Sequence, residues 1–214
     1  EMLVKEKIPH SVLNANNACW ILLRMKVHIE RLPVWREDFT IRTWSTGCQK
    51  LYFDREYEVY GSDGERIGWA SSVWIMANIE THRPLIPGKV DGLPSPVVQR
   101  DLYVFGQICP KFKSLPAEEV MTNKPVITKY ADYSELDHNH HVNNTRYMAW
   151  VMDALYKCEV DLSLIKDFDI TYVSELKSGE KVDIYVIKTD YGFYVTGWKD
   201  ESVRVFDSEI FLSV

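Results

Sequence analysis

The fold is decided by a stretch at residues 20–31, which reads Trp-Ile-Leu-Leu-Arg-Met-Lys-Val-His-Ile-Glu-Arg. It begins apolar and then alternates between apolar and polar residues, which is the pattern of a long β-strand with one buried face. Pro33 ends this strand, because proline cannot donate a hydrogen bond to a sheet ladder. Three further strand patterns follow, at 39–44, 51–60 and 66–79. A Gly-Ser-Asp-Gly turn joins the last two, so the region reads as an antiparallel meander.

The same order of elements recurs later in the chain, which indicates an internal repeat. Met25–Asp38 can be aligned with Phe168–Lys181, so Glu30 to Pro33 fall near Ser174 to Lys177. The strand patterns of this second half lie at 168–173, 182–188, 193–198 and 203–214. A short strand at 126–130 and a helix from Asn144 to about Cys158, with apolar residues at helical spacing, precede them. The second unit therefore reads strand, polar loop, helix and four strands.

The repeat predicts an N-terminal unit at 1–83, a C-terminal unit at 126–214 and a linker between them at 84–125. The linker is predicted from its many prolines, which suit irregular structure. The first unit shows four strands but has only nineteen residues before Trp20. We therefore expect its own first strand and helix to be missing or reduced to residues 1–7. The alternative is that the first unit never had that helix.

Composition narrows the class of protein. The 214 residues are 46% hydrophobic and 26% charged, as in a globular chain that buries a sizeable core. The net charge is −6, and residues 127–214 carry 9 basic and 16 acidic side chains, which argues against a broad nucleic-acid surface. No apolar run is long enough to span a membrane. The cysteines, without CxxC spacing, are expected to be buried or half-buried free thiols in a reducing compartment; they are Cys19, Cys48, Cys109 and Cys158.

The stretch 136–147 carries the chemistry and reads Leu-Asp-His-Asn-His-His-Val-Asn-Asn-Thr-Arg-Tyr. In an extended segment side chains alternate, so Asp137, Asn139 and His141 would share one face, with the other two histidines opposite. An acid, an amide and an imidazole would then meet at a helix N-terminus, where unpaired backbone N–H groups favour negative charge. A metal site is disfavoured, because no third ligand with standard spacing is present.

This stretch resembles the active-site loop of the acyl-acyl-carrier-protein thioesterases, in which Asp-x-Asn-x-His-Val-Asn-Asn is followed by a Tyr-bearing helix. Arg31–Trp35 and Ala70–Asn78 resemble two further stretches of the family, and the match covers nearly the whole chain from Trp20 onward. The resemblance implies an α+β fold, a tandem double hot-dog in which antiparallel sheets wrap around a central helix. The first unit would lack its N-terminal strand and helix.

The resemblance also implies hydrolysis of fatty acyl-acyl-carrier-protein thioesters to free fatty acid and carrier protein, without a cofactor or metal. Glu175 matches the family's glutamate and would be the base that activates water. His141 would polarise or relay a proton, and Asn139 would orient the water or hold the acyl carbonyl. Asp137 would fix the tautomer of His141 or anchor Asn139, or, alternatively, only cap the loop. Backbone N–H groups at 142–144 would stabilise the oxyanion.

The sequence departs from the plant members of the family at one position. A Cys commonly follows the glutamate there, whereas this chain has Leu176. A cysteine nucleophile at that position is thereby excluded, which leaves either an activated water or an inactive protein. Cys158 and Tyr147 are expected to pack in the core. Asn143 or Asn144 is expected to cap the helix rather than to take part in catalysis.

The partner implied by the resemblance is the acidic acyl carrier protein bearing a fatty acyl-phosphopantetheine, with no nucleic acid and no membrane. It is expected to meet the neutral N-terminal half or the linker. The candidate contacts are Arg83, Lys89, Arg100, Lys111 and Lys113. The acyl chain would lie in a pocket of the first unit. We expect a monomer or homodimer in a bacterial cytoplasm, or in a plastid if a transit peptide was removed. Two alternatives stay open, an acyl-CoA thioesterase of related hot-dog type and a non-catalytic acyl-binding hot-dog protein.

Overall fold

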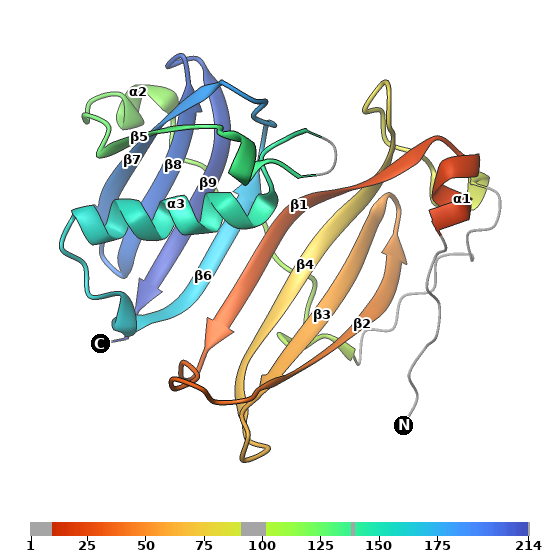
Figure 1. The fold of residues 1–214 in the computed structure, drawn as a ribbon, viewed down its shortest axis with the longest axis horizontal. Helices are drawn as coiled ribbons and strands as arrows, with labels where there is room; N and C mark the ends of the chain where they lie inside the picture. Colours follow the sequence, from red (N-terminus) through yellow and green to blue (C-terminus); the bar gives the residue numbers. More distant parts are fainter. Residues whose placement is uncertain (1–9, 91–101, 138–139, 214) are drawn as a thin grey trace. The chain divides into compact units, whose positions relative to one another are not determined.

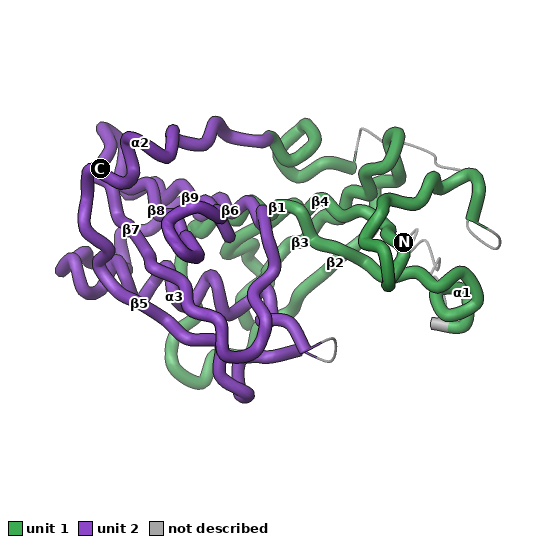
Figure 2. The backbone as a smooth tube through the Cα atoms, turned by 90° about the horizontal axis from the view of Figure 1, so that it is seen from above, with its two compact units in different colours: residues 1–110 green, residues 111–214 purple. Residues whose placement is uncertain are grey.

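The computed structural model describes residues 10–90, 102–137 and 140–213. The chain forms two compact units, residues 1–110 and residues 111–214, which Figure 2 draws in green and purple. The limits predicted above for the two units and the linker stay predictions. Within the described ranges, no helix has the length and apolar character needed to cross a membrane.

Unit 1 is built on an antiparallel sheet whose described strands run in the order β2-β3-β4-β1 (Figure 1). Its elements are α1 (His10–Ala15), β1 (Ala18–Ile29), β2 (Thr40–Gln49), β3 (Tyr52–Tyr60), β4 (Arg66–Asn78) and the 3-10 helix η1 (Pro87–Lys89). These strands confirm the predicted meander. Strand β2 runs beyond its predicted end, because a bulge between Ser45 and Gly47 interrupts the alternation that marks a strand. Among the described residues of this unit, α1 is the only α-helix.

Unit 2 places one long helix across an antiparallel sheet in the order β6-β9-β8-β7-β5 (Figure 1). Its strands are β5 (Ile127–Tyr130), β6 (Ile165–Tyr172), β7 (Lys181–Thr189), β8 (Gly192–Lys199) and β9 (Val203–Leu212). Its helices are α2 (Ala117–Val120), η3 (Tyr133–Glu135), α3 (Asn144–Lys157) and η4 (Leu162–Leu164). The face of α3 toward the sheet is apolar and buries Tyr147, Trp150, Val151, Ala154 and Leu155. The predicted helix and strands of this half are confirmed.

Two carboxylates in β3 of unit 1 are buried. The alternation of residues along this strand does not predict their burial. Asp54 is 1% exposed and Glu56 is 0% exposed. The Tyr103 hydroxyl donates to Asp54 Oδ2 at 2.9 Å, and the Val104 N–H donates to Glu56 Oε2 at 3.2 Å. Ser71 Oγ donates to Glu56 Oε1 at 2.7 Å. Two residues of the predicted linker are thus fixed to the sheet of unit 1, by one buried and one partly buried hydrogen bond.

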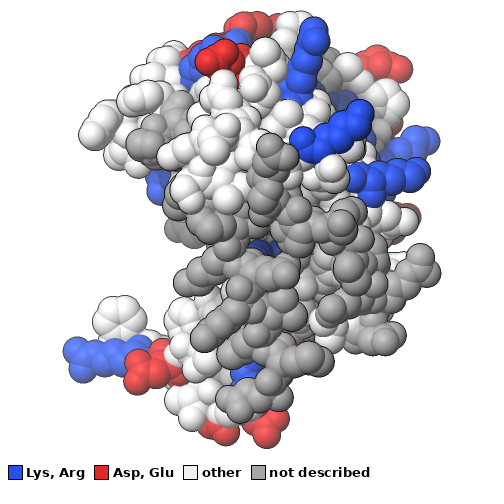
Figure 3. Space-filling view, turned by 90° about the vertical axis from the view of Figure 1, so that its right-hand side faces the viewer, with Lys and Arg blue, Asp and Glu red and all other residues white. Residues whose placement is uncertain are grey.

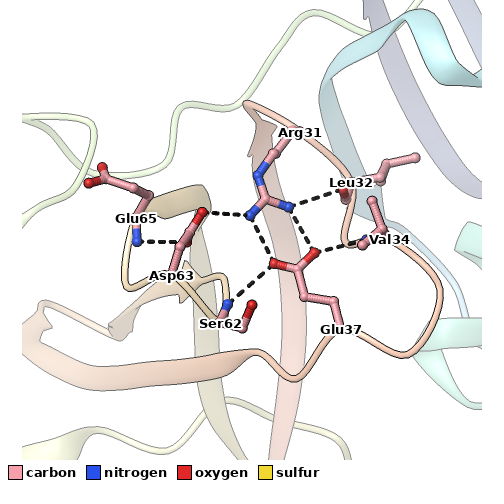
Figure 4. A network of polar contacts seen from close by, with 7 residues as sticks. All are labelled: Arg31, Leu32, Val34, Glu37, Ser62, Asp63 and Glu65. Atoms are coloured by element: carbon pink, nitrogen blue, oxygen red, sulfur yellow. Dashed lines mark hydrogen bonds and ion pairs between the residues drawn. The ribbon is translucent and has the colours of Figure 1, made fainter.

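A turn after β1 is organised around one glutamate, Glu37 (Figure 4). Arg31 donates to both carboxylate oxygens of Glu37, at 2.9 and 2.8 Å, and also to Asp63 Oδ2 at 3.3 Å. The backbone N–H groups of Val34 and Ser62 donate to the same carboxylate at 2.9 and 3.3 Å. The hydrogen bonds from Arg31 are the main reason that the pKa of Glu37 falls from 4.5 to about 2. Four hydrogen bonds from three residues therefore hold the Glu37 carboxylate in the turn.

Unit 2 contains the same turn after β6, organised around Glu180. The Lys177 N–H donates to Glu180 Oε2 at 3.0 Å, as Val34 does to Glu37. Lys199 pairs with Glu180 Oε1, and these contacts lower the pKa of Glu180. The backbone pattern also matches, because the first two residues after β1 and after β6 each donate to one carbonyl, of Ile67 and Val205 respectively. This match places Leu32 and Pro33 at the positions of Glu175 and Leu176.

Candidate active site

The loop before α3 is a tight turn rather than an extended segment. Leu136 and Val142 form an antiparallel bridge, and the Asp137 N–H donates to the His141 carbonyl at 2.7 Å. The His140 N–H donates to the Asp137 carbonyl at 3.1 Å, and His140 adopts a φ of 60°. The premise of an extended segment is therefore wrong, because these hydrogen bonds close a turn, and the grouping of the side chains by face stays a prediction.

His141 and Glu175 come from different segments and meet in unit 2. The distance from His141 Nδ1 to Glu175 Oε2 is 3.3 Å, within reach of a hydrogen bond or an ion pair. The side chains are 22% and 41% exposed respectively, so water reaches both. A bridge between His141 and Lys177, and a hydrogen bond of 2.9 Å from the Val142 N–H to the Leu176 carbonyl, join the loop to the turn after β6. The backbone therefore sets this pair of side chains side by side.

Asp137 closes the loop. Its Oδ1 accepts the backbone N–H of His141 at 3.2 Å. This contact favours the interpretation of Asp137 as a loop cap, and a direct catalytic role for it stays a prediction. Asn139, the other polar candidate, lies outside the described residues, as does His138.

The start of α3 confirms one predicted cap and narrows the predicted oxyanion donors. Asn143 is the N-cap, and its Oδ1 accepts the Thr145 N–H at 3.0 Å. The Val142 N–H donates to Leu176, and the Asn143 N–H donates to the Glu135 carbonyl at 2.9 Å. Of the three backbone donors predicted, these two are already engaged. The N–H of Asn144, the first residue of α3, stays the predicted donor, because the first N–H groups of a helix have no partner within the helix.

Tyr147 lies directly beneath the turn that carries Glu175. Its side chain is buried, as predicted for a core residue, and its hydroxyl accepts the Leu176 N–H at 3.3 Å. Sequence reasoning missed this polar role, for which the one signal is a Tyr, rather than a Phe, on the buried face of an amphipathic helix. Leu176 itself is 0% exposed, so the side chain at the position of the plant cysteine belongs to the core.

The cysteines form no disulfide among the described residues, and no group of three or more metal-ligating side chains occurs there. Cys48 and Cys109 are buried and Cys19 is half-buried, as expected. The prediction that Cys158 packs in the core is wrong, because it is exposed at the C-cap of α3, where the helix leaves the sheet.

The family models for the acyl-ACP thioesterase N-terminal and C-terminal domains match residues 4–86 and 118–210. The chain belongs to the acyl-ACP thioesterase family. A chloroplastic palmitoyl-acyl carrier protein thioesterase of Gossypium hirsutum is 33% identical over 143 residues, which are 64% of this chain and 33% of that protein. Oleoyl-acyl carrier protein thioesterase 2 of Arabidopsis thaliana is 29% identical over 178 residues, 77% of this chain and 46% of that protein. The chain thus spans a third to a half of the length of these relatives.

Solved structures of the family agree with this assignment. The acyl-ACP thioesterase of Bacteroides thetaiotaomicron aligns with a TM-score of 0.73 and 27% identity, over 95% of this chain and 80% of that one. The 12:0-ACP thioesterase of Umbellularia californica aligns with a TM-score of 0.74 at 18% identity, over 94% of this chain and 77% of that one, which shows the fold. Together with the helix and sheet of unit 2, these likenesses confirm the predicted α+β tandem hot-dog fold.

Proposed function

We propose that this member of the acyl-ACP thioesterase family hydrolyses fatty acyl-acyl-carrier-protein thioesters to free fatty acid and carrier protein. The observation that carries the proposal, beside family membership, is the 3.3 Å approach of His141 Nδ1 to Glu175 Oε2 at a partly exposed position. A carboxylate beside an imidazole that water can reach is the arrangement that general-base hydrolysis requires.

In the proposed reaction, the Glu175 carboxylate takes a proton from water while the water oxygen forms a bond to the thioester carbonyl carbon. The carbon–sulfur bond then breaks, and the proton passes to the departing phosphopantetheine sulfur. His141 holds Glu175 in place and relays that proton. The N–H of Asn144, at the start of α3, is the candidate donor to the oxyanion.

Leu176 supports a water mechanism over a cysteine mechanism. The residue after the proposed base has no nucleophilic atom, and its side chain lies in the core. No acyl-enzyme would therefore form at this position, and water would attack the thioester directly.

The proposed partner is the acidic carrier protein. Among the described residues on the face drawn in Figure 3, most of the Lys and Arg side chains lie in the upper half, with acidic side chains toward the margins. Four of the predicted contacts are exposed and stay candidates, namely Arg83, Lys89, Lys111 and Lys113. Arg100 lies outside the described residues.

The proposal is tested by comparing release of fatty acid from acyl-acyl-carrier-protein and from acyl-CoA of the same chain length. We expect turnover of the carrier-protein substrate with a higher kcat/KM than of the CoA substrate. A strong preference for CoA would replace the proposal by an acyl-CoA thioesterase. Binding of the acyl substrate without release of fatty acid would replace it by a non-catalytic acyl-binding protein.

A further inference from the structure

The residue after Glu175 is held by both of its backbone groups. The Leu176 N–H donates to the hydroxyl of Tyr147 at 3.3 Å, and the Leu176 carbonyl accepts the Val142 N–H at 2.9 Å. One contact comes from the buried face of α3 and the other from the loop that carries His141. The direction in which Glu175 leaves the backbone is therefore set by these two hydrogen bonds.

The ring of Tyr147 is held in a position that lets its hydroxyl accept the Leu176 N–H. The ring packs edge to face with Trp150, Tyr172 and Phe206, at centroid distances of 5.3, 5.7 and 5.6 Å. These neighbours come from α3, β6 and β9, and the tyrosine is 3% exposed. A side chain held on three sides offers its hydroxyl at a fixed point. Phenylalanine would keep all three ring contacts and lose only the hydroxyl.

The hydroxyl also lies within the electrostatic reach of the candidate site. Burial raises the pKa of Tyr147, and the charges of Glu175 and Asp137 raise it further. A raised pKa keeps the phenol protonated around neutral pH, so its oxygen accepts a hydrogen bond there and is not a second negative charge.

Unit 1 shows that the turn itself does not need this tyrosine contact. The matching turn there is anchored by Glu37 as this one is by Glu180, with the same backbone hydrogen bond three residues before each glutamate. The position of Leu176 is taken by Pro33, which has no N–H to donate. The bond to Tyr147 is thus an addition found in the unit that carries the His141–Glu175 pair.

We propose that Tyr147 is a positioning residue whose hydroxyl, through the Leu176 N–H, holds the Glu175 carboxylate against His141. This inference rests on the proposed hydrolysis and assigns to it a residue that touches neither the substrate nor the reacting atoms. Because small displacements of a base reduce turnover steeply, the contact would act on kcat rather than on substrate binding.

The test compares Tyr147→Phe with Tyr194→Phe in the full chain. Tyr194 is a matched control, because it is buried in the same unit and its hydroxyl donates to Asp207 Oδ1 at 2.6 Å, in a different part of the core. For Tyr147→Phe we expect kcat to fall about 10- to 100-fold with KM within about twofold of the wild type. The amide of Leu176 should also exchange with solvent faster. The control should leave both kcat and the Leu176 amide unchanged.

The outcomes separate the two proposals. Absence of wild-type turnover would overturn the proposed function and the positioning role with it. Wild-type turnover together with an unchanged kcat in Tyr147→Phe would overturn the positioning role alone. Circular dichroism at the assay temperature gives the folded fraction, so that kcat is compared per folded molecule. A fall in kcat equal to the loss of folded protein would also count against the inference.

Discussion

Glu37 and Glu180 occupy the same position in two copies of one turn. Each accepts the backbone N–H of the residue three before it, at 2.9 Å in unit 1 and 3.0 Å in unit 2. Each also pairs with a cation, Arg31 in the first turn and Lys199 in the second. The internal repeat therefore keeps the hydrogen bonds that hold the turn, but the residue at the matching position in the turn differs. At that position unit 1 has Leu32 and unit 2 has Glu175.

The first prediction concerns the acid sensitivity of the turn in unit 1. Glu37 has a pKa of about 2 in the folded chain, below its ordinary 4.5, so the folded state binds fewer protons than the unfolded state. Its contribution to stability is present above pH 4.5 and is lost as the pH falls from 4.5 through 2. We expect Glu37→Gln to lower the melting temperature at pH 7 and to narrow the difference from the wild type at pH 3. Thermal unfolding at the two pH values measures this. An equal deficit at both would contradict it.

For the buried carboxylate Glu56 we expect the opposite dependence of stability on pH. Burial raises its pKa from 4.5 to about 7, so the folded state binds more protons than the unfolded state between these values. Its cost to stability grows as the pH rises from 4.5 through 7, with an upper bound on the order of 3 kcal/mol. We expect Glu56→Gln to be more stable than the wild type at pH 8 and to lose that advantage at pH 5. Urea unfolding at both pH values provides the comparison.

The groups that face Glu56 supply the control for this prediction. Ser71 and Val104 donate to its carboxylate, and the charge of Asp54 raises its pKa. Burial also raises the pKa of Asp54, so Asp54→Asn should remove a second part of the same pH dependence. If Glu56→Gln left the slope of stability against pH unchanged, the dependence would have to come from another group.

The sequence predicted the strands well where alternation is unbroken and less well where local geometry interrupts it. The bulge between Ser45 and Gly47 hid half of β2. The loop closed by Asp137 and His141 is a turn, although its sequence predicted an extended segment. A reversal of the chain depends on backbone hydrogen bonds that side-chain type does not reveal. The burial of Glu56 could not be predicted either, since a segment some fifty residues later in the chain covers it, and a strand pattern contains no such information.

Of the predicted site, the sequence indicates that His141 and Glu175 lie close together, but it does not reveal the contacts that support them. The approach of His141 to Glu175 was expected from the resemblance and from the repeat, because both place the turn after a strand near the loop before the helix. The hydroxyl of Tyr147 was not expected, because a buried tyrosine at helical spacing reads as core. Its partner is a backbone N–H, which every non-proline residue has. The direction of such a donor depends on the folded backbone, which the residue types do not determine.

Replacing the proposed base or its partner should abolish turnover and leave the fold intact. For Glu175→Gln we expect a fall in kcat of roughly 10²–10⁴-fold, because the amide cannot accept a proton from water. For His141→Ala we expect a loss of similar size. Both side chains are partly exposed, so neither substitution opens a core cavity. Assays of acyl-acyl-carrier-protein turnover and a melting curve for each variant check this. Turnover like that of the wild type in the Glu175 variant would contradict the proposed mechanism.

The N-cap of α3 provides a stability prediction at the edge of the site. Asn143 Oδ1 accepts hydrogen bonds from the Thr145 N–H and from Thr145 Oγ1, at 3.0 and 2.8 Å. We expect Asn143→Ala to lower the free energy of unfolding by about 1 kcal/mol and Asn143→Asp to retain most of it. Chemical denaturation of the two variants measures this difference. Equal stability of the two variants would mean that the cap contributes little.

The last prediction separates a water mechanism from a cysteine mechanism at the position where this chain departs from plant members of its family. Leu176→Cys restores a thiol after Glu175, but that side chain points into the core, where the leucine is 0% exposed. We expect the variant to form no acyl-enzyme and to lose roughly 1–3 kcal/mol of stability from the cavity left by the smaller side chain. Mass spectrometry after mixing with acyl-acyl-carrier-protein detects an acyl adduct directly. Accumulation of an adduct on residue 176 would show that a thiol at this position reaches the substrate. The only remaining argument here for a water mechanism would then be that the natural residue, Leu176, has no thiol.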